Sequence, residues 1–523
     1  MSSSPGQGMA PYSSSMTKGQ ERRVLSRVIF FCLCASSGAL LFGMDSGTYG
    51  GFMAMRGFLQ DFGYYDTKTQ SLNISAGTQN AITLVNLAGT VVACFCSGFI
   101  GSHLGRRWGL FITGITAIIG VLLQVTSATR ATLIVGRFFA GGGIGFASNF
   151  VTVYNSEIAP FQLRTAMIGL WQTGANTAVL IGACVDQGTH LMKTRWSYRI
   201  PLLVQIFFPC VLSSLAFFIP ETPRWYLTRD RADDAAKAIR TLHGPLYPQE
   251  RVNADVADVA AHIEMERKFE ISTSYRDLIR GTDCRRTHLC VGIQVFQQFS
   301  GITFIFTFVT YFYSISGITN SFTSTMITDG CQLFGSFVMF PLLHYVGRRT
   351  IMLWGGAMQT ISMLALAIVG TAAPGSSAAG MSLVAFSCIY AFAFAFSWGP
   401  VAWALTTELS SNTLRSKTQS VASMVSWGLN MVITSFLPYL INTDEANIGP
   451  KVGYIFAGTG LIGFIWTWWF LPETMGRSLE ELDELFLNAC HVEQRTASGL
   501  EVFDVHDTLT ATEKVTENMQ EKV

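Results

Sequence analysis

Apolar stretches alternate with short polar intervals along most of this chain, and one longer polar interval divides them into two sets. Six runs lie near residues 27–52, 79–101, 108–127, 131–155, 164–187 and 199–219, and six more near 287–314, 322–346, 351–370, 381–407, 416–441 and 451–471. Each is about 20 residues or slightly longer, which suits an α-helix that crosses a bilayer. The pattern predicts an all-α polytopic membrane protein with twelve transmembrane helices in two six-helix bundles.

The polar intervals define the rest of the predicted organisation. We expect a disordered N-terminus over 1–26, bundles over 27–219 and 287–471, a helical linker over 220–286 and a polar tail over 472–523. In the linker, Arg231–Leu242 and Gln249–Glu270 are rich in Ala and charged residues, and Gly244-Pro245 separates them. They are predicted to form two short helices.

Composition excludes several classes of function. The chain is 49% hydrophobic and 13% charged with a net charge of +1, which fits a membrane protein and gives no sign of nucleic-acid binding. The sequence shows no nucleophile–base constellation and no metal-ligand spacing, so we expect no enzyme, no metal and no cofactor. Most cysteines lie in apolar runs and are interpreted as helix-packing residues. No signal-peptide cleavage pattern follows the N-terminus, so the first apolar run should remain as a spanning helix.

Basic residues cluster in alternate loops, beginning with Arg22 and Arg23 and continuing through the long polar interval. Because positive charge marks the cytoplasmic side, both termini are predicted to be cytoplasmic. Asn73-Ile74-Ser75 then forms a glycosylation sequon in the first outer loop, and its occupancy stays open.

Asp45 and Arg137 are charged residues inside apolar runs. At 1.5 Å per residue, Asp45 lies about 10 Å from the outer end of the first helix and Arg137 about 9 Å from the start of the fourth. These two helices run in opposite directions, so the two charges are expected at similar depth. An intramembrane acid is costly and functional by default, which favours a proton-coupling pair. A static ion pair that joins two helices is the alternative.

Three motifs recur in the same order in both halves of the chain. Gly105-Arg106-Arg107 returns as Gly347-Arg348-Arg349, and Pro220-Glu221-Thr222 returns as Pro472-Glu473-Thr474. Between them, an acid and an arginine seven residues apart occur as Glu157 with Arg164 and again as Glu408 with Arg415. The repeat predicts two related bundles that rock around a central substrate. We expect the charges to form an inner-gate network, consisting of Arg106, Arg107, Glu157, Arg164, Arg348, Arg349, Glu408 and Arg415; a topogenic charge cluster is the alternative for Gly-Arg-Arg alone.

These residues resemble the sugar porter family of the major facilitator superfamily, and the style of the first helix and the loop lengths resemble fungal members. The match covers roughly residues 27–486 and is carried by Asp45, Gly136-Arg137, Pro220-Glu221-Thr222-Pro223-Arg224, Gln297-Gln298-Phe299-Ser300-Gly301, Trp398-Gly399-Pro400 and Pro472-Glu473-Thr474-Met475-Gly476-Arg477.

The resemblance implies a sugar-binding set, namely Phe42, Gln172, Gln297, Gln298, Trp403, Trp427 and Asn430. Amide side chains match hydroxyls because both donate and accept hydrogen bonds, and indoles stack on the apolar face of a sugar ring. For the glutamines, hydrogen-bond links between helices are the alternative.

Some positions depart from the family pattern. Thr303 stands where Asn is usual, Ser426 stands where an amide is usual, and Phe306 and Thr307 replace aromatic hydroxyls. With Thr303 counted in the site, the pocket is expected to take a larger or differently hydroxylated substrate than glucose. Ser102, His103 and His344 also stand where the inner motifs usually carry an acid or a base, so an acid is missing from both predicted gates.

The resemblance implies import of a neutral sugar or polyol by alternating access, with a proton as the coupled ion. A facilitative uniporter is the alternative, and a non-transporting sugar sensor is a third interpretation that the short tail after Phe486 disfavours. We expect a monomer in a lipid bilayer, with the plasma membrane as the default location and no nucleic-acid partner.

Overall fold

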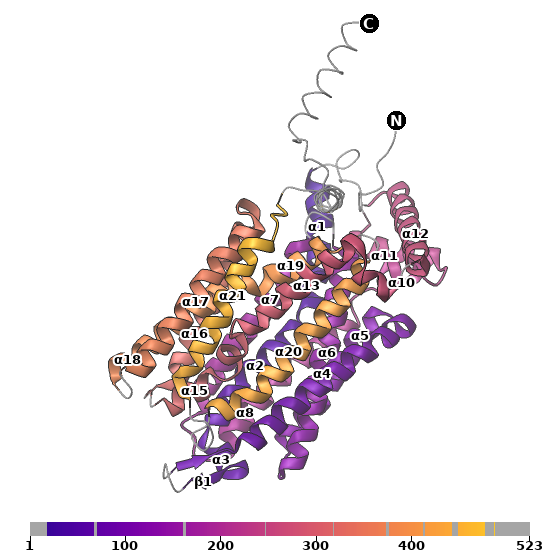
Figure 1. Ribbon diagram of the computed structural model, residues 1–523. Helices are drawn as coiled ribbons and strands as arrows, with labels where there is room; N and C mark the ends of the chain where they lie inside the picture. The colour runs from indigo at the N-terminus through magenta and orange to yellow at the C-terminus, as the bar shows by residue number, and fades with distance from the viewer. Residues whose placement is uncertain are drawn as a thin grey trace, which may run out of the picture.

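Long helices lie side by side through most of the molecule (Figure 1). The computed structural model describes residues 18–66, 71–159, 164–245, 247–272, 274–316, 318, 320–372, 376–411, 414–441, 448–475 and 486. The predicted all-α arrangement, with twelve spanning segments in two bundles, is confirmed among these residues. Several of its twelve segments are broken into consecutive helices, which the hydropathy pattern did not indicate.

The first bundle contains six segments. They are α1 (Lys18–Ser36) with α2 (Ala39–Ala54), α4 (Ala76–Leu104), α5 (Arg106–Val125), α6 (Arg130–Ile158), α7 (Arg164–Thr189), and α8 (Trp196–Gln205) with α9 (Phe207–Ala216).

The second bundle repeats this plan. Its segments are α13 (Gly281–Phe299) with α14 (Ile302–Thr307) and α15 (Val309–Ile315), α16 (Ser321–Tyr345), α17 (Arg348–Ala372), α18 (Ser377–Phe396) with α19 (Trp398–Leu409), α20 (Arg415–Ile441), and α21 (Val452–Phe470), which follows the short turn η3 (Gly449–Lys451).

Length and composition identify ten of the described helices as able to cross a membrane. The α7 segment and the α13–α15 segment complete the twelve. Both segments carry amide or acid side chains inside the bundle, including Gln172, Asp186 and Gln298. These polar side chains lower the mean hydropathy of the two segments.

Helix breaks follow from local backbone chemistry. Gly301 separates α13 from α14 with a φ of 95°, a left-handed conformation that glycine adopts at little cost. Pro209 and Pro400 lack the N–H that would bond the carbonyl four residues earlier, and breaks lie at Ile206 and Ser397. These breaks leave backbone carbonyls inside the bundles for side chains to bind.

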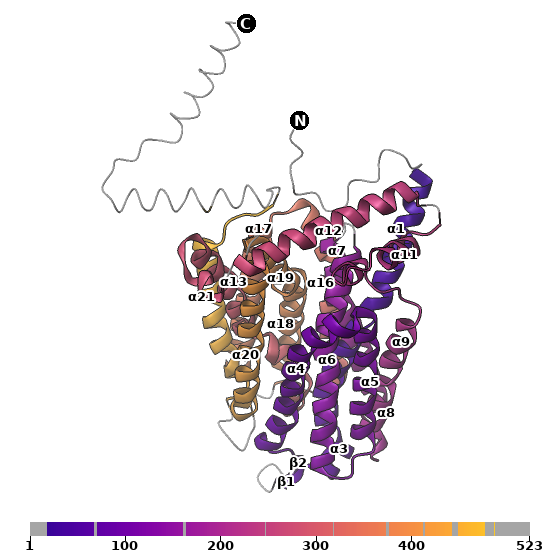
Figure 2. The same ribbon diagram turned by 90° about the vertical axis from the view of Figure 1, so that its right-hand side faces the viewer.

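The two ends of the molecule differ (Figure 2). One, which we call the linker end, carries α10 (Pro223–Leu227), α11 (Ala232–His243), α12 (Gln249–Ser272) and η2 (Tyr275–Ile279), so both predicted linker helices are confirmed. The other, the hairpin end, carries α3 (Arg56–Phe62) and an antiparallel hairpin that the sequence did not predict. Its strands are β1 (Tyr64–Asp66) and β2 (Ser71–Asn73), with Tyr64 opposite Asn73.

Direct hydrogen bonds join the two bundles at the hairpin end. Asn80 on α4 donates its Nδ2 to the Ser435 carbonyl on α20 at 2.8 Å, and Tyr311 on α15 donates its hydroxyl to Asn73 Oδ1 at 3.1 Å. Asn73 is only 8% exposed, so its sequon is enclosed in this structure. The hairpin end is therefore closed.

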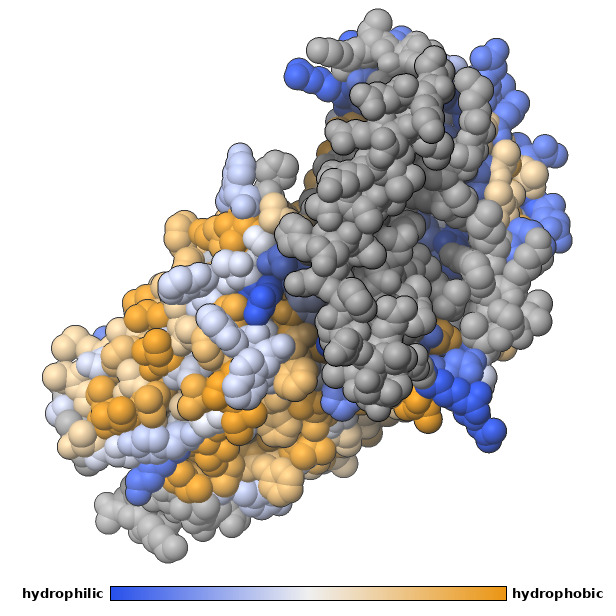
Figure 3. Space-filling model, turned by 45° about the horizontal axis from the view of Figure 1, so that its top comes forward, coloured by the Kyte–Doolittle hydropathy of each residue, from blue (hydrophilic) through white to orange (hydrophobic). Residues whose placement is uncertain are grey.

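Large apolar side chains cover the flanks of the bundles. Phe95 is 90% exposed and Trp469 is 75% exposed, which is unfavourable in water but suits contact with lipid chains. Figure 3 shows hydrophobic residues over one flank and hydrophilic residues toward the linker end. This distribution fits a multi-pass membrane protein.

Candidate functional site

Asp45 and Arg137 form a buried ion pair at the centre of the first bundle. Arg137 Nη1 lies 2.7 Å from Asp45 Oδ1, and both residues are 3% exposed. Asn86 Nδ2 donates to Asp45 Oδ2 at 2.9 Å, and Gln205 Nε2 donates to Oδ1 at 3.2 Å. The matched depth inferred from the sequence is therefore confirmed, whereas Asn86 and Gln205 were missed.

Arg137 is also held by an aromatic face. Its guanidinium lies 4.7 Å from the centre of the Tyr49 ring, and the Tyr49 hydroxyl bonds Thr83 and the Gln79 carbonyl. Such a cation–π contact stabilises a desolvated cation. Four helices, α2, α4, α6 and α8, thus converge on one carboxylate.

Glycine makes this convergence possible. A Cβ on Gly141 would collide with the Asn86 carbonyl, and a Cβ on Gly89 would collide with the Phe138 carbonyl. The α4 and α6 backbones therefore approach closely enough for Asn86 to reach Asp45, as small residues at helix interfaces allow.

A polar cluster lies in the second bundle, on α13, α14 and α20. Gln298 donates to Ser426 Oγ at 2.9 Å, and Asn430 donates both to Gln298 Oε1 at 3.1 Å and to Thr303 Oγ1 at 3.0 Å. Three of the sequence-derived binding residues are thus brought together. They offer hydroxyls and amides that a sugar hydroxyl could exchange with.

Gln297 has a different environment from its neighbour. Its Nε2 donates to the carbonyls of Trp398 and Gly399, at 2.7 and 3.1 Å. These carbonyls lie at the break between α18 and α19. In this conformation, the side-chain amide of Gln297 therefore links α13 to the first turn of α19.

Gln172 lies at the contact between the bundles. It donates to Asn176 Oδ1 at 3.0 Å, and Asn176 donates to Ser336 on α16 at 2.6 Å. Gln332 on α16 also donates to Asn176, at 3.0 Å. Gln172 therefore belongs to a polar bridge across the interface.

Aromatic rings flank this bridge. Phe42 stacks against Trp171 on α7 and against Phe306 on α14, with ring centres 6.5 and 5.7 Å apart. Trp403 on α19 and Trp427 on α20 are both half-buried. The stack joins the two bundles through Phe42.

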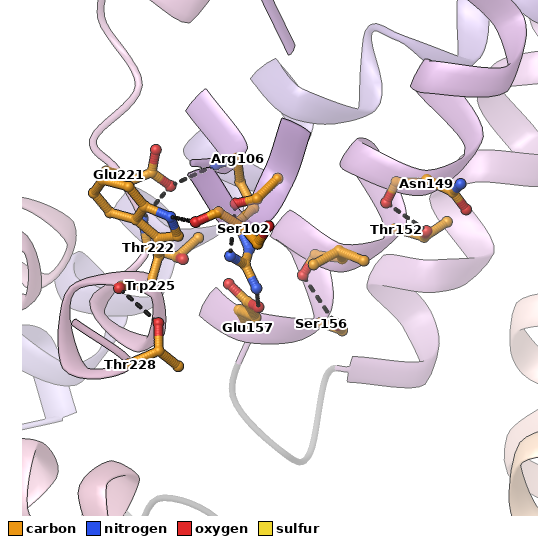
Figure 4. A network of polar contacts seen from close by, with 12 residues as sticks. Ser102, Arg106, Asn149, Thr152, Ser156, Glu157, Glu221, Thr222, Trp225 and Thr228 are labelled. Atoms are coloured by element: carbon orange, nitrogen blue, oxygen red, sulfur yellow. Dashed lines mark hydrogen bonds and ion pairs between the residues drawn. The ribbon is translucent and has the colours of Figure 1, made fainter. Parts of the chain in front are cut away.

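At the linker end, the first bundle contains a network of charged side chains that bond one another and nearby backbone groups (Figure 4). Arg106 Nη2 pairs with Glu157 Oε1 at 2.8 Å. Glu221 accepts hydrogen bonds from the backbone N–H groups of Arg106 and Arg107, both at 3.0 Å, and so caps α5. The Arg107 side chain donates to the carbonyls of Ala216 and Phe217.

The second bundle repeats this network at the same end. Arg348 Nε lies 3.6 Å from Glu408 Oε1, and Thr474 donates to Glu408 Oε2 at 2.6 Å. Glu473 accepts from the Arg349 N–H at 3.2 Å, as Glu221 does for α5. Arg164 and Arg415 begin α7 and α20, and their side chains lie outside the described part of the structure.

Glu221 and Glu473 add an acid to each of these networks, beside Glu157 and Glu408. A Cβ on Gly105 or on Gly347 would collide with the respective carboxylate, and Gly105 also has a φ of 95°, which favours glycine. Burial raises the pKa of Glu221, while hydrogen bonds from the Thr222, Arg107 and Arg106 backbones lower it. The repeated Pro-Glu-Thr sequence was the signal that could have identified these caps.

Two intramembrane acids were also missed. Asp186 on α7 and Asp329 on α16 are buried, although each stands in an apolar run where an acid is costly. Within the described residues, no group of three or more His, Cys, Asp or Glu side chains is placed to hold a metal ion.

Known proteins that resemble this chain over most of its length include transporters. A family model described as "Sugar (and other) transporter" matches residues 31–486. The chain is 33% identical over 470 residues to the major facilitator-type transporter ecdD of Aspergillus rugulosus, covering 86% of this chain and 85% of that one.

Two further similarities bear on function and fold. The chain is 31% identical to the high glucose sensor RGT2 of Saccharomyces cerevisiae, over 86% of this chain but only 60% of the sensor. The partially occluded inward-open structure of the xylose transporter XylE from E. coli superposes with a TM-score of 0.70 at 20% identity, covering 87% of this chain and 100% of that one.

Proposed function

Because this chain belongs to the sugar transporter family of the major facilitator superfamily, we propose that it imports a neutral sugar by alternating access and binds the coupled proton at Asp45. It is a transporter rather than an enzyme. The observation that carries the coupling proposal is the Asp45 carboxylate, buried between one arginine and two amides.

A proton on Asp45 would remove one charge of the pair. The attraction to Arg137 would then weaken, while the neutral acid could still bond Asn86 and Gln205. Since these partners lie on α4, α6 and α8, the proton changes the free energy of contacts that α2 makes with the rest of its bundle. We infer that proton binding stabilises the two conformations to different extents, as coupling requires.

The sugar is proposed to bind between the bundles. Gln172 and Phe42 would contact it from the first bundle, and Gln297, Gln298, Thr303 and Asn430 from the second, with the half-buried Trp403 and Trp427 stacking on the ring. Each polar group already has a hydrogen-bond partner, so a substrate must replace those bonds one for one. A sugar with matched hydroxyls achieves this.

Rocking of the bundles 27–219 and 287–471, connected by the linker 220–286, would expose this site alternately. The charge networks of Arg106, Arg107 and Glu157 and of Arg348, Arg349 and Glu408 lie within their own bundles here. With Arg164 and Arg415 they would exchange partners when the linker end closes. We infer that the linker end and both termini are cytoplasmic, that the membrane is the plasma membrane and that the protein acts as a monomer.

The test is sugar accumulation by purified protein in liposomes with an inward proton gradient. Asp45→Asn should abolish uphill accumulation yet retain exchange of sugar across the membrane. Asp61→Asn is the matched control, because Asp61 is an acid paired with the 65% exposed Arg195. Full accumulation by the Asp45 variant would refute coupling at this residue.

Two alternatives make different predictions. A uniporter would equilibrate sugar in these liposomes without any sugar-induced pH change. A sensor, which the similarity to RGT2 raises, would bind sugar without moving it. A competition assay over hexoses, pentoses, disaccharides and polyols, repeated with a protonophore, identifies the substrate and separates all three.

A further inference from the structure

Asp186 and Asp329 are two buried acids that the mechanism above does not use. Asp186 belongs to α7 of the first bundle and is 1% exposed, and Asp329 belongs to α16 of the second bundle and is 6% exposed. The helices that carry them pack against each other, because Asn176 on α7 bonds Gln332 and Ser336 on α16, and the charge of Asp329 acts on Asp186. The pair therefore spans the interface that must open and close during transport.

The packing of α2 against α7 places Asp186. A Cβ on Gly43 or Gly47 would collide with the backbone of α7, and a Cβ on Gly51 would collide with the Asp186 carboxylate itself. Asp186 is therefore pressed against the α2 backbone. Neither of its oxygens has a hydrogen-bond partner within the described residues.

The packing of α7 against α16 places Asp329. Asn176 of α7 bonds both Gln332 and Ser336 of α16, which fixes the register of these helices. Asp329 lies about one turn from Gln332 toward the hairpin end, and Asp186 lies further along α7 in the same direction. The two acids thus lie in the half of the interface that is closed in this structure.

The surroundings offer no compensating charge. The titratable groups that interact with Asp329 are Cys184 on α7, Tyr313 on α15 and Cys388 on α18, which in turn contacts Cys331. None of these is a cation. The imidazole of His190, four residues after Asp186, stacks on Phe322 and directs its Nδ1 to the Gln187 carbonyl. Among the described residues, no lysine or arginine acts on either acid.

Two ionised carboxylates cannot share such a site. An unpaired buried charge is strongly unfavourable, and a second like charge beside it adds to that cost. We propose that Asp186 and Asp329 form a second proton-binding site, which must hold at least one proton whenever the hairpin end is closed. The proton takes the role that a partner cation plays elsewhere.

This site is separate from the Asp45 pair. Asp186 lies beside Gly51, six residues beyond Asp45 on α2, or about 9 Å along the helix. Asp45 is directed to Arg137 within the first bundle, whereas Asp186 and Asp329 lie on α7 and α16, which pack against each other across the two bundles. The proposal therefore stands whether or not Asp45 couples transport.

The consequence is a proton-dependent hairpin end. When the bundles separate there, each acid meets water alone and can ionise. Closing the bundles then takes up a proton from that side, so acidity favours the closed arrangement and alkalinity favours the open one. Such a proton acts on the gate and need not cross the membrane.

Infrared spectroscopy of the purified full-length protein in lipid tests the proposal. Wild type at about pH 7, where exposed carboxyls are ionised, should show the C=O stretch of a protonated carboxylic acid. Asp186→Asn or Asp329→Asn should each reduce this band, because each removes the need for the shared proton. Asp45→Asn and Glu221→Gln are the matched acid-to-amide controls and should leave that component in place.

A second measurement does not depend on the variants folding. Labelling aspartate with ¹³C at the carboxyl carbon should shift the band in wild type and in Asp45→Asn, and the band should fade as the pH is raised. A band that fails to shift with this label, or that survives both Asp186→Asn and Asp329→Asn, would overturn the proposal. The melting temperature gives a further check. The melting temperature of the doubly substituted protein should rise relative to that of wild type as the pH is raised from about 5 to about 8.

Discussion

Removing Arg137 tests whether the central carboxylate is held as a compensated charge. In the variant Arg137→Leu, Asp45 would keep only the neutral donors Asn86 and Gln205, at 2.9 and 3.2 Å. The carboxylate would remain 3% exposed in a site built for an ion pair. Breaking a buried pair by removing one partner costs about 3–5 kcal/mol.

That cost corresponds to a fall of about two to four powers of ten in the folding equilibrium constant. It should appear as a lower free energy of unfolding in detergent micelles, measured by chemical denaturation at neutral pH. The loss should shrink in acid, because a proton on Asp45 then removes the uncompensated charge. The double variant Asp45→Asn/Arg137→Leu should recover most of the stability, since neither charge remains.

Arg195→Leu is the matched control. This arginine also pairs with an aspartate, at 2.9 Å, but its side chain is 65% exposed. A pair so exposed contributes about 0–1 kcal/mol. If Arg137→Leu lowers the free energy of unfolding no more than Arg195→Leu does, Asp45 is not held as a compensated charge. The same follows if the double variant is as unstable as Arg137→Leu alone.

Three further predictions concern regions outside the central pair. Glu221→Ala should cost about 1–2 kcal/mol in a melting experiment, because α5 loses a cap that accepts from two N–H groups, whereas the exposed Glu250→Ala should cost almost nothing. Burial lowers the pKa of His243 from 6.5 to about 4, so the folded state resists its protonation. Wild type should therefore lose up to about 3 kcal/mol as the pH falls from about 6.5 to about 4, and His243→Asn should show a flatter profile; equal slopes would contradict this. Asn73 is buried and accepts from Tyr311, so glycosidase treatment should leave the electrophoretic mobility unchanged, and a shift that Asn73→Gln abolishes would show the reverse.

The linear pattern determined the architecture for a simple physical reason. A bilayer demands about 20 apolar residues for each crossing, so the twelve runs and the charged loops are visible without any tertiary information. The repeat of Gly-Arg-Arg, Glu–Arg and Pro-Glu-Thr revealed two related bundles in the same way. Helix rise alone was sufficient to match the depths of Asp45 and Arg137, because both helices are constrained by the same membrane.

Partners that come from distant segments required the folded chain. Gln205 reaches Asp45 only because α8 packs against α2, and Glu221 caps α5 only because the chain returns to the linker end after α9. The hairpin at Tyr64–Asp66 escaped notice because three-residue strands have too short a pattern to recognise. Asp186 and Asp329 were visible as acids, but a sequence cannot say that the helices carrying them pack against each other.

The sequence by itself thus determined how many times the chain crosses the membrane, which halves are related and that Asp45 and Arg137 lie at matched depth. Only the tertiary structure decided which of the polar side chains meet. The physical reason is that hydropathy acts on each segment separately, through its own contact with lipid or water. Hydrogen bonds and ion pairs depend instead on distances of a few ångströms between helices, which close glycine packing sets.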